Sequence, residues 1–433
     1  MLSQILFAIA LFCGIAFFIR NVQKIKRNIW LGKKINRSDN KAKRWQKTML
    51  IALGQSKMMA LPVAGILHIT AYLGFFIINI ELLEIIIDGL FGSHRAFGFM
   101  GGFYDALIGG FEILAALVLI AVTLFFVRRK LLPIQRFKIL KGFPKTDAYL
   151  ILIIEFFLML AFLCMNAADF YLHQIQGIDL AGSFPISKYL FSGFKNLNET
   201  TLFIIERTAW WFHILGILVF LNYLYYSKHL HILLAFPNVW YSKLQPKGEL
   251  DNLESVKKEV ALMMDPNIDP FSVTPEPSTE TFGANDIFDL NRVQLLNAYT
   301  CTECGRCTAE CPAHLTGKKL SPRKIMMKTR DRLEEVSKNI DKNKEFVPDN
   351  KTLLSDYISA EEIWACTSCN ACTQACPIEI DPLSIIINLR QYLVMEKSEA
   401  PTELNHMMQN IENNGAPWQF NNADRLNWVN DKY

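Results

Sequence analysis

The 433-residue sequence predicts an all-α membrane protein, in which five transmembrane helices precede a helical, cysteine-rich domain. Three observations support this fold class. Five long apolar stretches lie within residues 1–236, and hydrophobic residues make up 51% of the whole chain, more than is usual for a soluble protein. Residues 1–236 carry 24 Lys and Arg against 12 Asp and Glu, whereas the rest carries 21 against 29. Eight of the ten cysteines form two clusters after residue 300.

These observations also exclude some classes of protein. The positive charge lies between apolar stretches rather than on one soluble face, so a uniformly basic nucleic-acid-binding protein is excluded. Tight cysteine clusters indicate metal ligation rather than the disulfide framework of a small secreted protein.

Each apolar stretch approaches the roughly 20 residues that a helix needs to cross a bilayer. The first lacks a positively charged start and a small-residue cleavage site, so we interpret it as a retained anchor rather than a signal peptide. The five expected spans are 3–19, 61–83, 106–127, 147–166 and 208–229.

The connecting segments predict the orientation, because Lys and Arg near helix ends favour the cytoplasmic side. Residues 20–57 contain 12 Lys and Arg with one acidic residue, and residues 128–147 contain seven with one. Residues 85–105 and 167–206 contain few basic residues. We therefore expect a multi-pass protein of the bacterial inner membrane, with the N-terminus outside and the cysteine-rich half in the cytoplasm.

Histidines inside apolar spans are the next signal, since polar side chains in lipid are costly and usually face a bundle interior. His68 and His213 lie within predicted spans, and His229 and His231 lie at the inner end of the fifth. On one continuous helix, His213 and His231 would share a face about 27 Å apart, and His229 would point elsewhere. This spacing suits axial ligands of two metal centres, and imidazole is a common haem ligand. The alternative is that each histidine only hydrogen-bonds a neighbouring helix.

The segments GILHITAYLGFF and WWFHILGILVF followed by SKHLHI resemble the cytochrome b subunit of respiratory nitrate reductase and the membrane subunit of heterodisulfide reductase. The resemblance implies that His68 and His231 hold an inner haem b. It also implies an outer haem on His213, but the position of the expected partner is Ile78. A second haem would then need another ligand, a five-coordinate iron, or would be missing.

Several histidines and acidic residues lie near the predicted outer ends of the membrane spans. His94 and His173 are candidates for the missing ligand, although we expect both to be solvated loop histidines. Glu81, Glu84 and Asp88 could take up or release protons, but interfacial carboxylates that reach toward water are the preferred interpretation.

The sequence divides into four regions. Residues 1–236 form the expected cytochrome b-like domain, and 237–285, rich in Pro, Ser, Thr and acidic residues, a mostly extended linker. Residues 286–400 form the two-cluster domain, and 401–433 a tail expected to dock a partner.

Two copies of the pattern C-x2-C-x2-C-x3-C-P are the most specific signal in the chain. Three closely spaced thiolates bind one [4Fe-4S] cluster, while the fourth ligates the other cluster. Zinc is the rival metal, since its sulfur sites also use C-x2-C pairs. The expected ligands are Cys301, Cys304, Cys307 and Cys376 for cluster 1, and Cys366, Cys369, Cys372 and Cys311 for cluster 2.

Between the motifs lies a 54-residue insert that is longer than in a compact small ferredoxin. It resembles the helical two-cluster domain of succinate dehydrogenase and of the small heterodisulfide reductase subunit. Its basic group is expected to be a solvated helix start, with docking of an acidic carrier as the alternative. That group is Lys318, Lys319, Arg323 and Lys324.

A broader resemblance covers nearly the whole chain. The segments CTECGRCTAECPAHLTGKKLSPRK, IWACTSCNACTQACPIEIDP, LRQYLVMEK and ENNGAPW are similar to membrane iron–sulfur oxidoreductases that link electron-transfer flavoprotein to menaquinone. Those proteins usually continue into cysteine-rich CCG domains, so the resemblance implies a separate CCG-domain subunit as partner.

The expected function is that of an oxidoreductase subunit in a respiratory chain, which carries electrons between a cytoplasmic partner and the quinone pool. We expect no catalytic acid, base or nucleophile in this chain. We also expect no nucleic acid as a partner. One alternative is a heterodisulfide-reductase-like complex in which quinol reduces a thiol or sulfur substrate. The other is a haem-free membrane anchor that recruits a redox partner.

Overall fold

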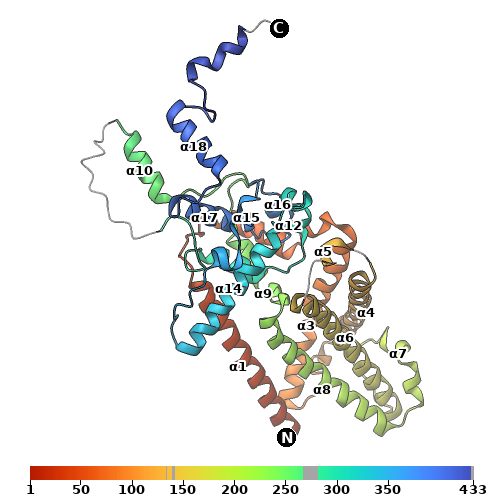
Figure 1. Ribbon diagram of the computed structural model, residues 1–433. Helices are drawn as coiled ribbons and strands as arrows, with labels where there is room; N and C mark the ends of the chain where they lie inside the picture. Colours follow the sequence, from red (N-terminus) through yellow and green to blue (C-terminus); the bar gives the residue numbers. More distant parts are fainter. Residues whose placement is uncertain (133, 139–141, 267–280, 431–433) are drawn as a thin grey trace.

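The computed structural model describes residues 1–132, 134–138, 142–266 and 281–430. The regular secondary structure of these residues is helical, and no β-strand occurs among them. Figure 1 shows a bundle of long helices and, at one end of it, a set of shorter helices that contains the cysteine motifs. The predicted fold class is confirmed.

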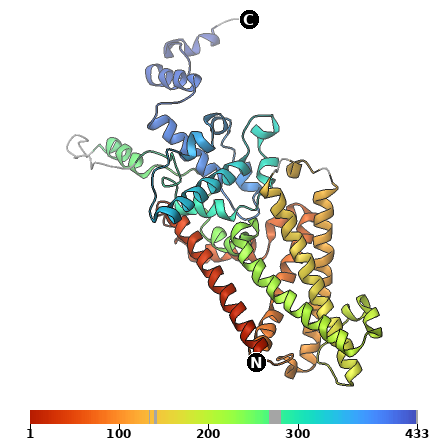
Figure 2. The same cartoon turned by 60° about the horizontal axis from the view of Figure 1, so that its bottom comes forward.

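Five helices are long and apolar enough to cross a membrane. α6 packs against α4 and α8, α3 packs against α4, and α1 contacts both α3 and α8. Figure 2 shows these helices side by side, with the N-terminus at the end remote from the cysteine motifs. The five are α1 (Leu2–Trp30), α3 (Pro62–Phe91), α4 (Gly102–Lys130), α6 (Phe143–Gln176) and α8 (Glu199–Tyr223).

The helices extend beyond the apolar stretches that predicted them. α1 continues past the expected span 3–19 as far as Trp30, because its last turns have partners outside the bundle. Lys24 and Arg27 form ion pairs with Asp341 of the cysteine-rich domain, at 2.7 and 2.6 Å. A prediction from hydropathy places the end of a span at the first charged residues. The helix itself continues as long as its residues have packing partners.

The expected continuous fifth helix over 208–229 is wrong at its inner end. α8 ends at Tyr223, two 3₁₀ turns follow, and α9 (His231–Trp240) begins at His231. Asp147 of α6 accepts hydrogen bonds from the Tyr223 hydroxyl at 2.6 Å and from the backbone N–H of Lys228 at 3.1 Å. The break therefore has a tertiary cause, and His213 and His231 lie on different helices.

Short helices connect the long ones. α2 (Lys41–Thr48) follows α1, and its Arg44 is buried and donates to the backbone oxygens of Trp240 and Ser242 at the end of α9. α5 (Gln135–Lys138) joins α4 to α6, and α7 (Ser187–Leu190) lies between α6 and α8.

The cysteine-rich domain is built from short helices around two longer ones. Two capping boxes, Asn291 with Gln294 and Ser359 with Glu362, define the starts of α11 and α15. Leu295, Ile325 and Leu389 are fully buried in its core. Its helices are α11 (Arg292–Thr300), α12 (Arg306–Ala309), α13 (Pro312–Leu315), α14 (Pro322–Asn343), α15 (Ala360–Trp364), α16 (Ala371–Ala375) and α17 (Pro382–Met395).

This domain is packed against the bundle. Glu303 is buried between Lys228, at 2.8 Å, and Arg330 of α14. Asn28 of α1, also buried, donates to the Tyr299 hydroxyl at 2.7 Å. These contacts set the position of the cysteine motifs relative to the helix ends.

Parts of the expected linker 237–285 belong to the packed body. The Asn238 side chain is buried and donates to the backbone oxygen of Ile378 at 2.7 Å. At the other end, the Ala284 N–H donates to the backbone oxygen of Asn388 at 2.9 Å. α10 (Glu254–Met264) lies in between, and residues 267–280 are outside the described part of the chain.

The expected tail 401–433 extends from the domain as α18 (Thr402–Asn414) and a 3₁₀ helix over Asn422–Val429, with 431–433 outside the described residues. Figure 1 shows this segment projecting away from the body. Phe420, Leu426 and Trp428 are about two-thirds exposed.

Candidate functional site

The two cysteine motifs share one backbone conformation. Glu303 and Gly305 in the first, and Ser368 and Asn370 in the second, all have positive φ between 56° and 75°. Each pair stands at the same offset from the first cysteine of its motif and leads into a short helix, and these helices, α12 and α16, contact one another. Alternation of left-handed residues turns successive N–H groups toward one point, which suits an anionic cluster.

Gly305 stands at a position of the first motif that favours glycine, although Asn370 has the same conformation in the second motif. Its φ is +75°, and a Cβ atom at this position would lie 2.7 Å from Nη1 of Arg323. Both the backbone conformation and the close approach therefore favour glycine.

Cysteines from both motifs meet at a small cavity in the domain. It is lined by Cys301, Cys304, Cys307 and Cys376, and Cys372 also reaches it. The first four are the expected ligands of cluster 1, although Cys376 comes from the second motif. Ligation by this set remains a prediction, but the chain brings its members together.

The second group shows the same exchange. Cys366 lies close enough to Cys311 and Cys369 for electrostatic interaction, although Cys311 belongs to the first motif. Backbone N–H groups reach the sulfur atoms in both groups: Ser368 N donates to Cys366 Sγ at 3.4 Å, and Ile380 N donates to Cys376 Sγ at 3.3 Å. Such bonds to ligand sulfurs tune iron–sulfur centres.

Burial makes these thiols poor acids on their own. It raises the pKa of Cys301 to about 11 and of Cys376 to about 12. A bound metal is what converts such thiols into thiolates at neutral pH.

The spread of the sulfur atoms distinguishes the two candidate metals. In a tetrahedral zinc site with bonds of about 2.3 Å, neighbouring sulfurs would lie roughly 3.8 Å apart. All eight cysteines are within the described residues, and no three of their sulfurs lie within 4.8 Å of one another. A multi-iron cluster, whose ligands attach to separate corners, suits this wider spacing.

His68 of α3 faces His231 of α9, with ring centroids 6.3 Å apart and planes tilted by 41°. His231 Nδ1 lies 3.0 Å from the Lys228 carbonyl oxygen, so donation to that oxygen leaves Nε2 free to bind a metal. His68 Nδ1 is buried without a hydrogen-bond partner. With metal–nitrogen bonds of about 2 Å, an iron between two imidazoles would separate their centroids by roughly 6 Å. The pair therefore fits axial ligation of a haem.

The surroundings of this pair also fit a haem. One cavity is lined by both histidines, by apolar side chains from α3 and α9, and by four arginines that could face carboxylates. Thr302, Cys304 and Ile378 of the cysteine motifs line the same cavity. Its arginines are Arg128, Arg129, Arg136 and Arg306.

Of the two other histidines of this region, His229 differs from expectation, whereas the role of His213 stays a prediction. His229 does not point elsewhere: it lines the same cavity, its ring centroid lies 5.5 Å from that of His231, and its Nε2 pairs with Glu155 at 3.2 Å. His213 is buried, with Nδ1 2.9 Å from the Leu158 carbonyl oxygen.

His94 and His173 cannot serve as the missing partner of His213. His173 lies 15 residues after Leu158 on α6, about 22 Å along the helix from the oxygen that His213 contacts. His94 stacks on His173, with ring centroids 5.1 Å apart. The interpretation as a solvated loop histidine is wrong for His173, which is part of α6, whereas His94 does lie in the loop after α3 with 44% of its side chain exposed. Both histidines contact Asp169.

The outer carboxylates are not interfacial groups that reach toward water. Glu81 and Glu84 are only 5% and 4% exposed. Glu84 accepts hydrogen bonds from the Phe97 N–H at 2.8 Å and the Tyr104 hydroxyl at 2.7 Å. Asp88 accepts the Arg95 and Ala96 N–H groups and so orders the loop after α3.

The basic group near 318–324 is only partly a solvated helix start. Lys319 pairs with Glu361 on the surface, but Arg323 is 1% exposed and donates to the backbone oxygen of Arg136, on the segment that joins α4 to α6. Arg323 therefore connects the domain to the bundle.

Comparisons with known proteins agree with the cysteine motifs. Residues 300–380 match the family model of the 4Fe-4S dicluster domain. The chain is 30% identical to the probable iron–sulfur-binding oxidoreductase FadF of Bacillus subtilis, over 98% of this chain and 60% of that protein. It is 27% identical to the EtfAB:quinone oxidoreductase of Syntrophomonas wolfei, over 94% of this chain and 57% of that protein.

A third relative matches a shorter region: the chain is 31% identical to a probable membrane-anchored ferredoxin of Chromohalobacter salexigens, over 32% of this chain and 22% of that protein. No solved structure matches the chain significantly. The chain thus spans about 60% of the length of the first two relatives. It carries a 4Fe-4S dicluster domain and is related to iron–sulfur oxidoreductases.

Proposed function

We propose that this chain is a membrane electron-transfer subunit that carries electrons between a cytoplasmic redox partner and the menaquinone pool. The observation that carries the proposal is the shared cavity: the paired histidines His68 and His231 and the cluster-1 residue Cys304 line the same space. Two sets of metal-binding residues from distant parts of the sequence are thus neighbours.

The residues present fit the groups that the relatives imply. The eight motif cysteines would hold two [4Fe-4S] clusters, and His68 and His231 would hold haem b. When bound, these groups supply centres that accept and donate single electrons. The ring of His213 faces that of Phe162, with centroids 5.9 Å apart, so we assign one haem rather than two.

The polypeptide holds the two ligand sets at a constant separation. Lys228 and Arg330 enclose the buried carboxylate Glu303, two residues after Cys301. Lys57 donates to the backbone oxygen of Cys376, and Asn238 to that of Ile378. If a flexible linker alone joined the dicluster domain to the helix bundle, the distance between the two would vary. These contacts hold that distance constant.

Sidedness is part of the same proposal. Lys24, Arg27, Lys57 and Arg136, from the two basic segments, lie at the end of the bundle that carries the dicluster domain. By the positive-inside rule this end faces the cytoplasm. The domain would then meet soluble donors, and the apolar helices would meet quinone within the bilayer.

Electron-transfer flavoprotein is our proposed donor, acting through a CCG-domain subunit. The name of the Syntrophomonas relative links that protein to EtfAB and quinone, and the present chain aligns with 57% of it. The exposed apolar residues of the tail are the proposed docking element for the subunit. They are Met407, Met408, Ile411, Trp418, Phe420, Leu426, Trp428 and Val429.

A second candidate is a heterodisulfide-reductase-like protein that uses quinol to reduce a thiol or sulfur substrate. It is favoured by matches to five heterodisulfide reductase subunits. One, from Methanosarcina mazei, is 30% identical over 33% of this chain, and another, from Methanosarcina acetivorans, is 28% identical over 26% of it. These matches are short, whereas the Syntrophomonas relative, which is named an EtfAB:quinone oxidoreductase, matches 94% of the chain.

Spectroscopy of the full chain, purified in detergent with any co-purifying subunit, tests the proposal. We expect a reducible haem b spectrum, a cubane signal after dithionite, and oxidation of the reduced protein by a menaquinone analogue. Reduction by reduced electron-transfer flavoprotein, but not by dithiols, supports the first candidate, and the reverse supports the second. A preparation without porphyrin would leave the haem-free anchor and overturn the relay.

A further inference from the structure

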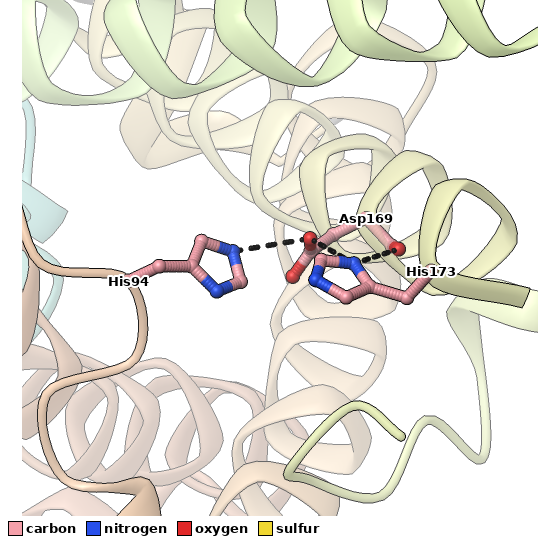
Figure 3. Close-up of side chains that lie close together, drawn as sticks. All are labelled: His94, Asp169 and His173. Carbon is pink, nitrogen blue, oxygen red and sulfur yellow. Dashed lines mark hydrogen bonds and ion pairs between the residues drawn. The ribbon is translucent and has the colours of Figure 1, made fainter. Parts of the chain in front are cut away.

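Two histidines and one aspartate converge at the end of the bundle remote from the dicluster domain (Figure 3). Asp169 Oδ1 lies 3.1 Å from His94 Nε2 and 3.1 Å from His173 Nδ1. One ligand atom from each of the three residues lies within 4.8 Å of the other two. Among the described residues this is the only such group of His, Cys, Asp and Glu.

Two elements create this convergence. Asp169 and His173 are one turn apart on α6 and so share a face of the helix. His94 comes from the loop between α3 and α4, and its ring stacks on that of His173 with an interplanar angle of 21°. Figure 3 shows the two rings on either side of the Asp169 carboxylate.

The carboxylate is held in a set orientation. Arg95 forms an ion pair with Asp169 Oδ2 at 2.8 Å, and it also donates to Tyr104 and Asn166. Oδ1 is thereby directed to the imidazoles. Asp169 itself is 3% exposed, so its position does not depend on solvent.

An acidic cavity of about 120 Å³ is lined by two of the three residues, His94 and Asp169, and favours a cation. Five carboxylates and only two guanidinium groups line it, together with His94. Glu81 is 95% buried, lines this cavity, and has an Oε2 atom with no hydrogen-bond partner. The carboxylates are Glu81, Glu84, Asp88, Asp169 and Glu206, and the guanidinium groups are Arg95 and Arg207.

We propose that His94, Asp169 and His173 form a binding site for a divalent cation of the zinc type. Two imidazoles and one carboxylate are a ligand set for Zn²⁺ and similar transition metals, whereas Mg²⁺ and Ca²⁺ prefer oxygen ligands throughout. The His94 side chain is 44% exposed, so water can complete the coordination. The bound ion would join the loop after α3 to α6.

The two nitrogens of His173 would have different roles. Nδ1 contacts the backbone oxygen of Asp169 at 3.0 Å and its Oδ1 at 3.1 Å, and donation from Nδ1 leaves Nε2 with its lone pair for a metal. The alternative is a purely structural ion-pair cluster of Asp169 with both imidazolium rings. In that case Asp169 would face three cations, including Arg95, with the two rings stacked against each other.

Zinc binding to the full chain provides the test. The purified protein is treated with a chelator, dialysed against Zn²⁺ alone, and analysed for zinc and iron in the same sample. We expect about one zinc per chain, lost in His94→Gln and His173→Gln with at least a tenfold fall in affinity. Iron content that matches wild type shows that each variant is folded.

The matched control is His406→Gln, which changes an exposed histidine on α18. It should bind zinc as wild type does. Zinc that persists in the His94→Gln/His173→Gln double variant would reside elsewhere, for example on cysteines, and would overturn the proposal. Absence of zinc from the wild-type protein would overturn it as well, whatever the outcome of the haem and quinone experiments.

Discussion

Lys57 donates a hydrogen bond from Nζ to the backbone carbonyl oxygen of Cys376, at 2.8 Å. Lys57 lies in a short 3₁₀ helix, Ser56–Ala60, just before α3, whereas Cys376 ends the second cysteine motif. The same ammonium group pairs with Glu379, which is 7% exposed and also faces Lys47 at 3.0 Å. The entrance to the membrane helix is thus in direct contact with an expected cluster ligand.

Replacing Lys57 with Met should shift the reduction potential of cluster 1 to a more negative value. The substitution removes a positive charge and a hydrogen bond beside Cys376, and net charge and hydrogen bonding set such potentials. It should also cost about 1.5–3 kcal/mol at the interface, as is usual for a hydrogen bond to a charged group. Redox titration followed by paramagnetic resonance measures the potential. Lys43→Met, which removes an exposed charge from α2, should leave the potential unchanged.

Double substitutions of cysteine test the exchange of ligands between motifs. The double variant Cys301→Ala/Cys376→Ala lacks two ligands of the same expected cluster. About four of the roughly eight cluster irons should therefore remain. Cys366→Ala with Cys376→Ala removes one ligand from each cluster and should remove nearly all of them. If each motif instead bound its own cluster, the two double variants would show the opposite iron contents.

Substitution of His68 or His231 by Ala should abolish the low-spin haem spectrum, because each provides one axial ligand in our proposal. His229→Gln should keep that spectrum, since His229 pairs with Glu155 although it lines the same cavity. Reduced-minus-oxidised absorption spectra separate the outcomes. Loss of the spectrum in His229→Gln, with retention in His68→Ala, would show that the wrong imidazole has been paired with His231.

Asp349 predicts a pH dependence of stability in the dicluster domain. Asp349 Oδ2 lies 2.6 Å from Nη1 of Arg332, whose guanidinium is fully buried. These hydrogen bonds with Arg332 hold the pKa of the Asp349 carboxyl below its usual range. A lowered pKa means that the ion pair stabilises the protein above the unfolded-state pKa of about 3.9. That stabilisation is lost as the pH falls through the folded-state pKa.

Accordingly, Asp349→Asn should lower Tm by a constant amount between pH 6 and 5, and the difference from wild type should shrink below about pH 4. Thermal unfolding in detergent at several pH values measures this. Arg332→Leu should be more harmful, by about 3–5 kcal/mol, because it leaves Asp286 and Asp349 without their buried partner. The exposed pair Lys319–Glu361 offers a control, and Glu361→Gln should change Tm little.

Features set by local sequence were predictable. Apolar length identified all five long helices, and the regular cysteine spacing indicated the dicluster domain. Which cysteine of each motif ligates the other cluster stays a prediction. The pairing of His68 with His231 came from resemblance to a family, because spacing along one helix could not choose among the histidines. The assumption of that helix was itself wrong.

The break between α8 and α9 illustrates what spacing does not reveal. No proline or glycine separates Tyr223 from His231, and the only local sign of a break is the polar run Ser227, Lys228 and His229. The chain turns because Asp147, 76 residues earlier than Tyr223, accepts hydrogen bonds from both sides of the break.

The group of His94, Asp169 and His173 was missed for a related reason. Asp169 lies near the end of an apolar stretch, where one carboxylate carries little signal, and His94 is 75 residues away. A histidine four residues after an aspartate was the only local sign.

What the sequence determined by itself was the chemistry available and the length of each apolar stretch, since ligand types, short spacings and hydropathy depend on near neighbours along the chain. The tertiary structure alone decided contacts that no local pattern marks: Asp147 with Tyr223 and Lys228, and His94 with Asp169. The physical reason is that helix packing and buried hydrogen bonds act between segments far apart in sequence, and their partners leave no periodic pattern to detect.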